Sequence, residues 1–388
     1  MNNKNTYVAI MAGGIGSRFW PASRTARPKQ FLDILGVGKS LIRLTFERFL
    51  NLCPAENIFI VTNKQYAGLV KEHLPELSDN QILTEPSRNN TAPCVAYTAF
   101  KLQALNPEAN LVVAPSDHII LQEQKFVRTL ESALAFTAEN DALVTLGIQP
   151  SRPDTGYGYI EVGSGKWEGG SGKAEVGSGK AEGGSGKAEV GENGVAVSVS
   201  PVQKVAAFRE KPDLATAEQY LASGNYLWNA GIFIWRTQSL LKAYQQHAHE
   251  IHRILAAGAS KYNTPEEQAF IDEAYPTTPS ISVDYAIMEN ADNVYTIPSE
   301  FGWSDLGTWA SLHAESDKDE AGNVLQGAVM AYGVKDSLVR LPKGKLAVLG
   351  GLDGYIVVDE GDVLLVWPKS REQEIKKITG EIEEEEYL

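Results

Sequence analysis

The sequence has few cysteines, no long apolar segment and a deficit of basic residues. Its 388 residues include two cysteines, Cys53 and Cys94, without a CxxC or Cys/His spacing, which argues against structural zinc or a disulfide framework. No stretch approaches the roughly 18 apolar residues of a membrane span. The formal net charge of -14 disfavours nucleic-acid and membrane-surface partners, since both prefer basic faces. These absences predict a cytoplasmic protein with neither kind of partner.

One basic segment departs from this acidic balance, because no Asp or Glu precedes Asp33. An apolar run from Tyr7 to Met11 predicts a buried strand, and a glycine-rich turn and four cations follow it: Gly13, Gly14, Gly16, Arg18, Arg24, Arg27 and Lys29. Glycines permit close backbone approach, and free N–H groups with cations bind anions, so the segment predicts a polyphosphate site. It differs from the dinucleotide fingerprint, which has a third glycine. Asp33 stands where a P-loop before Gly38-Lys39-Ser40 needs glycine.

Short apolar strands alternate with helices over the first 148 residues. Strands are expected at 6–12, 57–62, 81–85, 109–115 and 142–148, with helices between them. This pattern predicts an α/β fold with a mostly parallel sheet that is covered on both faces. Three of these strands end in polar clusters: the glycine turn, Glu85 to Asn90, and Asp117. Because ligands bind beyond the carboxyl ends of parallel strands, these clusters predict one site.

The rest of the chain divides by composition. Residues 163–190 are four heptads with two or three glycines each, which argues against a stable helix. We expect a solvated loop insertion over 163–194, without a catalytic role. Short strands separated by Gly, Asp and Lys turns over 323–367 predict a small β unit. The predicted organisation is an α/β catalytic domain over 1–315, a small β domain over 316–370, and an acidic tail over 371–388 that starts helical and then frays.

Several motifs in this order resemble the sugar-nucleotide pyrophosphorylases, most closely their mannose/GTP branch. The motifs are Met11-Ala-Gly-Gly-Ile-Gly-Ser-Arg18, Arg27-Pro-Lys-Gln-Phe31, Glu85-Pro-Ser-Arg-Asn-Asn-Thr-Ala-Pro93, Pro115-Ser-Asp-His118, Thr155-Gly-Tyr-Gly-Tyr-Ile160, Phe208-Arg-Glu-Lys-Pro212, Trp228-Asn-Ala-Gly-Ile-Phe233, Ser282-Val-Asp-Tyr-Ala286 and Gly302-Trp-Ser-Asp-Leu-Gly307. The resemblance covers about residues 5–315 outside the insertion. It implies a Rossmann-like nucleotidyltransferase fold with a mixed, mostly parallel central sheet, followed by the small C-terminal β domain.

The resemblance also implies a reaction. A phosphate oxygen of mannose 1-phosphate would attack the α-phosphorus of GTP, and GDP-mannose would form as pyrophosphate leaves. Such a transfer needs two polyanions positioned and neutralised, and no covalent intermediate. By resemblance Asp117 and Asp305 are metal ligands, and two hard oxygen ligands together with substrate phosphates suit Mg²⁺. Taken alone, Asp117 would fit a helix N-cap and Asp305 a turn.

The remaining site residues are likewise carried over from the resemblance. Arg18 and Lys29 would hold the GTP phosphates, and Gly13, Gly14 and Gly16 would let the backbone approach them. Ser87, Asn89, Asn90 and Thr91 would meet the guanine and ribose, although Asx-type turns would explain these polar residues equally well. The sugar phosphate would lie among Gly156, Glu210, Lys211, Asn229 and Asp284.

Two alternative functions and the oligomeric state stay open at this stage. The same chemistry could serve another sugar 1-phosphate, such as glucose 1-phosphate, with a different nucleoside triphosphate. A catalytically silent homologue could instead bind GDP-mannose and regulate a partner, although this chain keeps Arg18, Lys29, Asp117 and Asp305. The sequence does not fix the oligomeric state, but the apolar strands of the β unit favour a homodimer. Because the chain has no room for a further isomerase domain, we expect a single activity.

Overall fold

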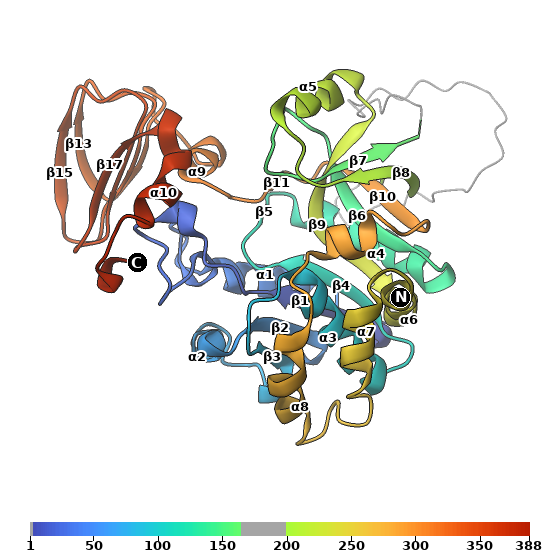
Figure 1. Ribbon diagram of the computed structural model, residues 1–388. Helices are drawn as coiled ribbons and strands as arrows, with labels where there is room; N and C mark the ends of the chain where they lie inside the picture. The colour runs from blue at the N-terminus through green and yellow to red at the C-terminus, as the bar shows by residue number, and fades with distance from the viewer. Residues whose placement is uncertain (1–2, 164–198) are drawn as a thin grey trace.

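A nine-stranded sheet forms the centre of the computed structural model, which describes residues 3–163 and 199–388 (Figure 1). The predicted heptad insertion therefore lies outside the described residues, apart from Gly163. The strand order is β3-β2-β1-β4-β9-β6-β10-β8-β7. In chain order the strands are β1 (Thr6–Met11), β2 (Ile58–Asn63), β3 (Ile82–Glu85), β4 (Asn110–Pro115), β6 (Leu143–Ile148), β7 (Tyr159–Val162), β8 (Gln203–Arg209), β9 (Tyr226–Arg236) and β10 (Val294–Ser299).

The strand directions confirm the predicted mixed, mostly parallel sheet. β3, β2, β1 and β4 pair in parallel, as do β6 and β10. β9 inserts antiparallel between β4 and β6, and β8 runs antiparallel to both β10 and β7. The carboxyl ends of β1, β3 and β4 consequently lie at one edge of the sheet.

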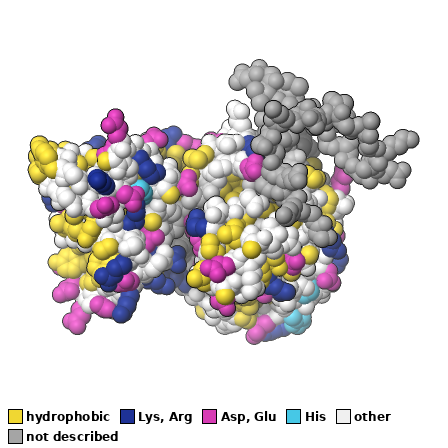
Figure 2. Space-filling view, turned by 90° about the horizontal axis from the view of Figure 1, so that it is seen from above, with side chains coloured by type: hydrophobic (Ala, Val, Ile, Leu, Met, Phe, Trp, Pro, Cys, Tyr) yellow, Lys and Arg dark blue, Asp and Glu magenta, His cyan; other side chains and the backbone are white. Residues whose placement is uncertain are grey.

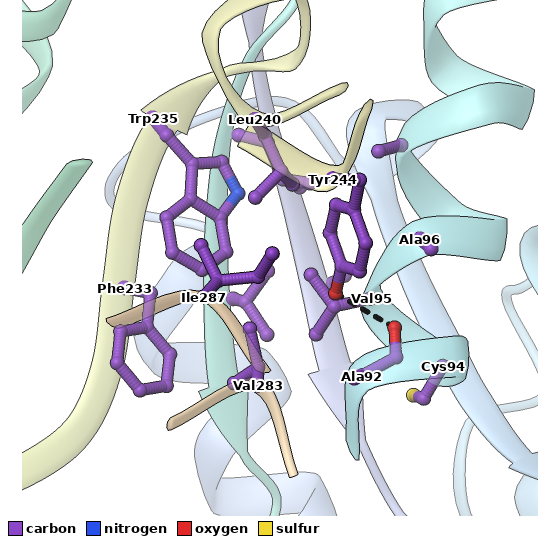
Figure 3. Packing of buried hydrophobic residues seen from close by; sticks show 14 of the residues in the cluster. Ala92, Cys94, Val95, Ala96, Phe233, Trp235, Leu240, Tyr244, Val283 and Ile287 are labelled. Carbon is purple, nitrogen blue, oxygen red and sulfur yellow. Dashed lines mark hydrogen bonds between the residues drawn. The ribbon is translucent and has the colours of Figure 1, made fainter. Parts of the chain in front are cut away.

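Both faces of the sheet are buried, as the continuous apolar strands predict. Successive residues of β1 alternate between two cores, with Tyr7 and Ala9 in one and Val8 and Ile10 in the other. Figure 3 shows part of the first core, where Trp235 of β9 lies near Leu240 and Ile287. The Tyr244 hydroxyl donates a 2.7 Å hydrogen bond to the Ala92 carbonyl there, so a polar atom in this core is satisfied.

Helices cover the two faces of the sheet. α3 (Thr91–Leu105), α6 (Thr237–His247), α7 (His249–Ala256) and α8 (Glu267–Ala274) contribute to the first core, with a π-helical turn at Asp284–Met288. α1 (Leu41–Phe49), α2 (Ala67–His73) and α4 (Glu123–Glu139) cover the other face. α5 (Leu214–Ser223) packs near β7 and β9 through Ala217. In the described residues, no helix is long and apolar enough to cross a membrane.

The C-terminal region is the predicted β unit. It comprises β12 (Val324–Gln326), β13 (Ala328–Tyr332), β14 (Leu338–Arg340), β15 (Leu346–Gly350), β16 (Tyr355–Asp359) and β17 (Leu364–Pro368). The chain winds between two sheets, β12-β14-β16-β17 and β13-β15. A third core joins this unit to the first domain, because Leu338 and Ile356 cluster with Phe19, Trp20 and α9 (Trp309–Glu315).

The expectation that the acidic tail frays is wrong. A 3-10 helix (Lys369–Glu374) continues into α10 (Ile375–Thr379), and a last 3-10 turn spans Glu385–Tyr387. The Trp20 indole donates a 2.7 Å hydrogen bond to the Tyr387 carbonyl, and Arg24 donates to the Glu386 carbonyl at 3.0 Å. Hydrogen bonds to backbone carbonyls therefore hold the tail against the basic segment, and such acceptors leave no signal in the sequence pattern.

Candidate active site

The two predicted metal carboxylates lie close together because a short ladder joins distant segments. β5 (Ile119–Ile120) follows Asp117, and β11 (Trp303–Ser304) precedes Asp305. These two strands pair antiparallel, Trp303 with Ile120 and Ser304 with Ile119. The predicted aromatic turn around Asp305 thus includes a short strand, and the ladder brings that turn to the carboxyl end of β4.

The glycine-rich loop presents unpaired backbone donors. Two side chains fix its carbonyl groups. The Gln30 amide donates to the Ala12 and Gly14 carbonyls, and the Ser23 hydroxyl donates to the Ile15 carbonyl. Within the described residues, the N–H groups from Gly13 to Gly16 have no hydrogen-bond partner. Such donors are satisfied by water or by an anion, so the loop can receive phosphate oxygens.

Gly16 is required by its backbone conformation. Its φ of 69° lies in the left-handed region, and an added Cβ would lie 2.6 Å from Cβ of Lys29. The close contact places the lysine stem directly under the loop.

The Lys29 ammonium is buried and joins three segments of the chain. Its Nζ lies 2.7 Å from Asp117 Oδ2, and it donates to the Leu306 carbonyl at 2.8 Å and to the Asp305 carbonyl at 3.3 Å. Lys29 is 4 % exposed. These three acceptors use the three donors of an ammonium group. The Lys29 ammonium is therefore held by the Asp117 carboxylate and by the backbone of the turn that carries Asp305.

The Asp117 carboxylate keeps its charge although it is partly enclosed. Burial acts to raise the pKa of Asp117, but the Lys29 ammonium acts against burial, and the pKa lies below its usual range. Asp305 Oδ1 accepts hydrogen bonds from the Tyr157 hydroxyl at 2.7 Å and from the Gly307 N–H at 3.1 Å. Ionised carboxylates with fixed orientation are suitable ligands for a hard divalent cation.

His118 is fixed by a local hydrogen bond. Its Nδ1 accepts from the Trp303 indole at 3.1 Å, and burial lowers its pKa. The ring is therefore neutral near pH 7 and contributes no charge to the site.

A cavity of about 340 Å³ collects these groups. Its walls carry two carboxylates, three basic residues and part of the glycine loop: Gly16, Ser17, Arg18, Lys29, Asp117, His118, Asp305, Gly307 and Lys376. Lys376 comes from α10, and the sequence analysis gave it no role. Arg24 and Arg27 lie elsewhere, since Arg24 pairs with Asp362 at 2.6 Å and Arg27 lies 3.9 Å from Glu72.

The residues predicted to meet the base follow β3. The Ser87 hydroxyl is buried and has no partner within the described residues. The Asn90 side chain accepts from the Thr91 N–H at 2.8 Å and so caps α3, while Thr91 accepts from the Val283 N–H. Ser87 and the exposed Asn90 thus follow closely on the end of β3.

Asn89 requires a correction. Its side-chain nitrogen donates to the Tyr275 carbonyl at 3.1 Å and to the Thr278 carbonyl at 2.8 Å. Asn89 is buried, and both N–H bonds are used inside the protein. Its NH₂ group therefore ties the loop to the segment after α8 and cannot donate to a base.

Glu85 is a residue of this region whose side chain the sequence analysis did not single out. Its carboxylate is buried, accepts a hydrogen bond from the Tyr275 hydroxyl, and would lie 3.6 Å from a Cβ at Gly13. Burial raises its pKa to about 7 against opposing hydrogen bonds from Tyr275 and Cys94. The sequence carried a signal for Glu85, because an acidic residue at the end of a predicted buried strand is unusual and Glu85 opens the Glu85–Pro93 motif.

A second polar cluster unites four of the residues predicted to meet the sugar phosphate. Asn229 donates to Asp284 Oδ1 at 3.0 Å, and its own Oδ1 accepts from the Thr145 hydroxyl at 2.7 Å. Lys211 pairs with the buried carboxylate of Glu210. Burial, with the nearby Glu210 charge, raises the pKa of Asp284 to about 7. The cluster offers a cation, an amide and carboxyl groups, which can bind phosphate and hydroxyl groups.

Gly156 does not join this cluster. It is exposed, and its N–H donates to Asp154 at 2.8 Å. Gly158, two residues later, accepts from the Asn229 N–H at 2.8 Å, and a side chain there would collide with the Glu210 carboxylate. The second glycine of the Gly-Tyr-Gly motif, Gly158, therefore contacts the cluster, and the first glycine, Gly156, does not.

The second cluster adjoins the cavity. The Gly231 N–H donates to Asn229 Oδ1, and an added Cβ at Gly231 would lie 3.8 Å from Pro115 and 4.0 Å from His118. The glycine loop, the pair Asp117 and Asp305, and the second cluster thus form one continuous polar region. A site of this kind defines an enzyme that transfers a group between two phosphorylated substrates.

Comparisons with known proteins agree with this class. The nucleotidyl transferase family model matches residues 7–176 and 181–322. A mannose-1-phosphate guanylyltransferase of Salmonella montevideo is 36% identical over 376 residues, which cover 96% of this chain and 73% of that protein. A mannose-1-phosphate guanylyltransferase of Escherichia coli K12 is 33% identical, over 98% of this chain and 74% of its own length.

A solved structure is similar over its whole length. The crystal structure of a protein from Thermus thermophilus, described as a mannose-1-phosphate geranyltransferase, aligns with a TM-score of 0.80 and 28% identity. The alignment covers 98% of this chain and 100% of that chain. The chain therefore belongs to the nucleotidyl transferase family and, within it, to the mannose-1-phosphate guanylyltransferases.

The raised pKa of Glu85 makes stability depend on pH. The folded value of about 7 lies above the ordinary 4.5, so the folded state retains this proton while the unfolded state loses it. Stability should therefore fall as pH rises from about 4.5 to 7, by about 3 kcal/mol from this group. Glu85→Gln should lack this component. The difference in unfolding free energy, Glu85→Gln minus wild type, should therefore rise between pH 5 and pH 8.

Denaturant unfolding at several pH values measures this difference. Glu139→Gln, at an exposed position of α4, is the matched control and should follow the wild-type curve. Parallel curves for Glu85→Gln and the wild type would contradict a buried, protonated Glu85.

Proposed function

We propose that the protein joins GTP and α-D-mannose 1-phosphate to give GDP-mannose and diphosphate. The observation that carries this proposal is a polar cavity that Asp117, Asp305 and the glycine loop line together, with the Asn229–Asp284 cluster next to it at Gly231. Two anionic substrates, one bound in the cavity and one at the cluster, would meet at the carboxylate pair.

The proposed step is a direct displacement at the α-phosphorus of GTP. A phosphate oxygen of mannose 1-phosphate forms the new O–P bond, while the bond from the α-phosphorus to the oxygen bridging to the β-phosphate breaks. The electron pair of the broken bond leaves with pyrophosphate, so atoms and charge balance without a covalent enzyme intermediate. The protein contributes orientation and charge neutralisation.

Arg18 and the glycine loop bind the triphosphate in this proposal. The unpaired N–H groups from Gly13 to Gly16 receive phosphate oxygens, and Arg18 adds a guanidinium from the exposed side. Lys29 adds positive charge while its hydrogen bonds hold Asp117 and the turn at Asp305 in place.

Ser87, Asn90 and Thr91 are proposed to meet the guanine and ribose. The buried, unpartnered Ser87 hydroxyl supports this assignment, since buried polar atoms are normally satisfied. Gly13 of the loop lies beside Glu85, two residues before Ser87 in the chain.

The second cluster is proposed to bind mannose 1-phosphate. Lys211 provides the cation for the sugar phosphate, while Glu210, Asn229 and Asp284 provide groups for the hydroxyls. The backbone at Gly158 takes the place that the sequence analysis gave to Gly156.

Asp117 and Asp305 are proposed to hold Mg²⁺. The donor set fits, because two carboxylates face one polar cavity, and a cation with few protein ligands completes its shell from substrate phosphates and water. When bound, the ion neutralises charge on the phosphates. Among the described residues, no group of three or more His, Cys, Asp or Glu side chains could hold a metal alone. Metal binding should therefore depend on the nucleotide.

A substrate panel tests the function. We expect pyrophosphate release to be fastest with GTP and mannose 1-phosphate among the four nucleoside triphosphates crossed with mannose, glucose and other sugar 1-phosphates. Faster release with glucose 1-phosphate and another triphosphate would identify a different nucleotidyltransferase. Binding of GDP-mannose without any turnover would identify a silent homologue.

Replacing either carboxylate tests the metal assignment. Asp117→Asn and Asp305→Asn should each lower kcat by at least about 100-fold, because charge stabilisation at the reacting phosphates is lost. Asp317→Asn, at an exposed position, is the control and should keep wild-type turnover. An Asp305→Asn protein that retained Mg²⁺-dependent activity would overturn the assignment.

We also propose a homodimer through the sheet β13-β15. Met330, Tyr332, Leu346 and Val348 are 44–63% exposed there, and neither strand contains a charged residue. Figure 2 shows hydrophobic side chains gathered along this end of the molecule. An uncharged apolar face suits a second copy, because a two-fold interface buries the same patch on both subunits.

Sedimentation velocity tests the homodimer. The wild type should sediment as a dimer and Val348→Glu as a monomer. Leu214→Glu, at a similarly exposed apolar residue of α5, should stay dimeric. A monomeric wild type would contradict the proposal.

A further inference from the structure

α10 is anchored beside the segment that carries Arg18. Ile375, its first residue, is fully buried in the core that contains Phe19 and Trp20. α10 packs on the short 3-10 helix Ser17–Phe19, and Figure 1 shows it next to the basic segment of the first domain. The end of the chain is therefore part of the wall of the cavity.

A neighbouring contact fixes this arrangement. The Glu372 carboxylate accepts a 2.7 Å hydrogen bond from the Ala310 N–H at the start of α9 and lies near Arg18. α9 follows the turn that contains Asp305, so the same few residues link α10 to both sides of the cavity.

Lys376 faces the cavity with its charge available. It lines the cavity with Arg18, Lys29 and both carboxylates. The donors of Lys29 are used by protein acceptors. Among the described residues, by contrast, no carboxylate lies within salt-bridge distance of Lys376, which is exposed. Arg18 and Lys376 are thus the cations of this wall that can turn toward a polyphosphate.

The direction of the displacement indicates which phosphate Lys376 would meet. In an in-line transfer, the attacking and leaving oxygens lie on opposite sides of the phosphorus. The proposed sugar-phosphate cluster comes from β8, β9 and Asp284, whereas α10 lies on the other side of β5 and β11 (Figure 1). The leaving pyrophosphate would then depart toward α10.

We propose that Lys376, supplied by the C-terminal segment, binds the β- and γ-phosphates of GTP and the pyrophosphate that they become. Its ammonium neutralises the charge that grows on the leaving group as the bond to the α-phosphorus breaks, and it transfers no proton. This assignment rests on the proposed function. With this role for Lys376, the C-terminal segment contributes a residue to the active site.

Kinetics and binding with two neighbouring lysines test this role. Lys376→Ala should raise the KM for GTP and, in the reverse reaction, the KM for pyrophosphate by about tenfold, as expected for one charge-assisted hydrogen bond. The KM for mannose 1-phosphate should not change. Lys376→Arg should restore most of the loss, because it keeps the charge. Lys377→Ala, the next and also exposed residue of α10, should match the wild type in every constant.

Calorimetric titration of each protein with pyrophosphate and Mg²⁺ separates this inference from the proposed function. Weaker pyrophosphate binding by Lys376→Ala, with Lys377→Ala unchanged, would support the role even if the wild type used another nucleotide or sugar. Equal pyrophosphate affinity of Lys376→Ala and the wild type would overturn it, as would an equal loss in both lysine variants. Failure of the wild type to form GDP-mannose would refute the proposed function alone.

Discussion

The Lys29 ammonium is the contact on which the site depends. It joins the end of β4, through Asp117, to the carbonyls of Asp305 and Leu306 in a turn that lies far away in the sequence. A buried ammonium without partners would cost several kcal/mol, so its three acceptors must be held together. Leu306 has a φ of 45°, unusual for a bulky residue, and its carbonyl accepts from Lys29. The backbone strain at this turn thus coincides with the contact that aligns the two carboxylates.

The site contains two kinds of anion receptor. The glycine loop offers backbone N–H groups, whose direction is fixed because side chains of Gln30 and Ser23 hold the carbonyls. The second cluster offers side chains, and burial raises the pKa of Asp284, one of its carboxyl groups. Backbone donors suit a phosphate chain, whereas carboxyl and amide groups suit a ring of hydroxyls.

The C-terminal unit is continuous with the first domain. Leu338, Ile356 and Ile375 share a core with Phe19 and Trp20, and Arg24 of the basic segment pairs with Asp362. Arg24 of the basic segment therefore stabilises the contact between the two units. Lys376, from the C-terminal segment, lines the cavity. The segment that directly follows the glycine loop thus also forms the contact with the β unit.

The sheet could be predicted from the sequence pattern. Continuous apolar strands can be buried only between two layers of helices, so a mostly parallel sheet and a common edge for the polar ends of its strands followed from the pattern, whereas the order β3-β2-β1-β4 did not. The motifs then supplied Asp117 and Asp305 as a pair, which no spacing along the chain could reveal.

Which polar groups are free depends on the tertiary structure. Asn89 and Asn90 are adjacent amides in the sequence, yet the first is used by Tyr275 and Thr278 and the second caps α3. Lys376 stands in an ordinary charged segment, and only the burial of Ile375 brings it to the cavity. Periodicity reports which face of an element is buried, whereas the partner of a hydrogen bond or an ion pair depends on contacts between residues far apart in the chain.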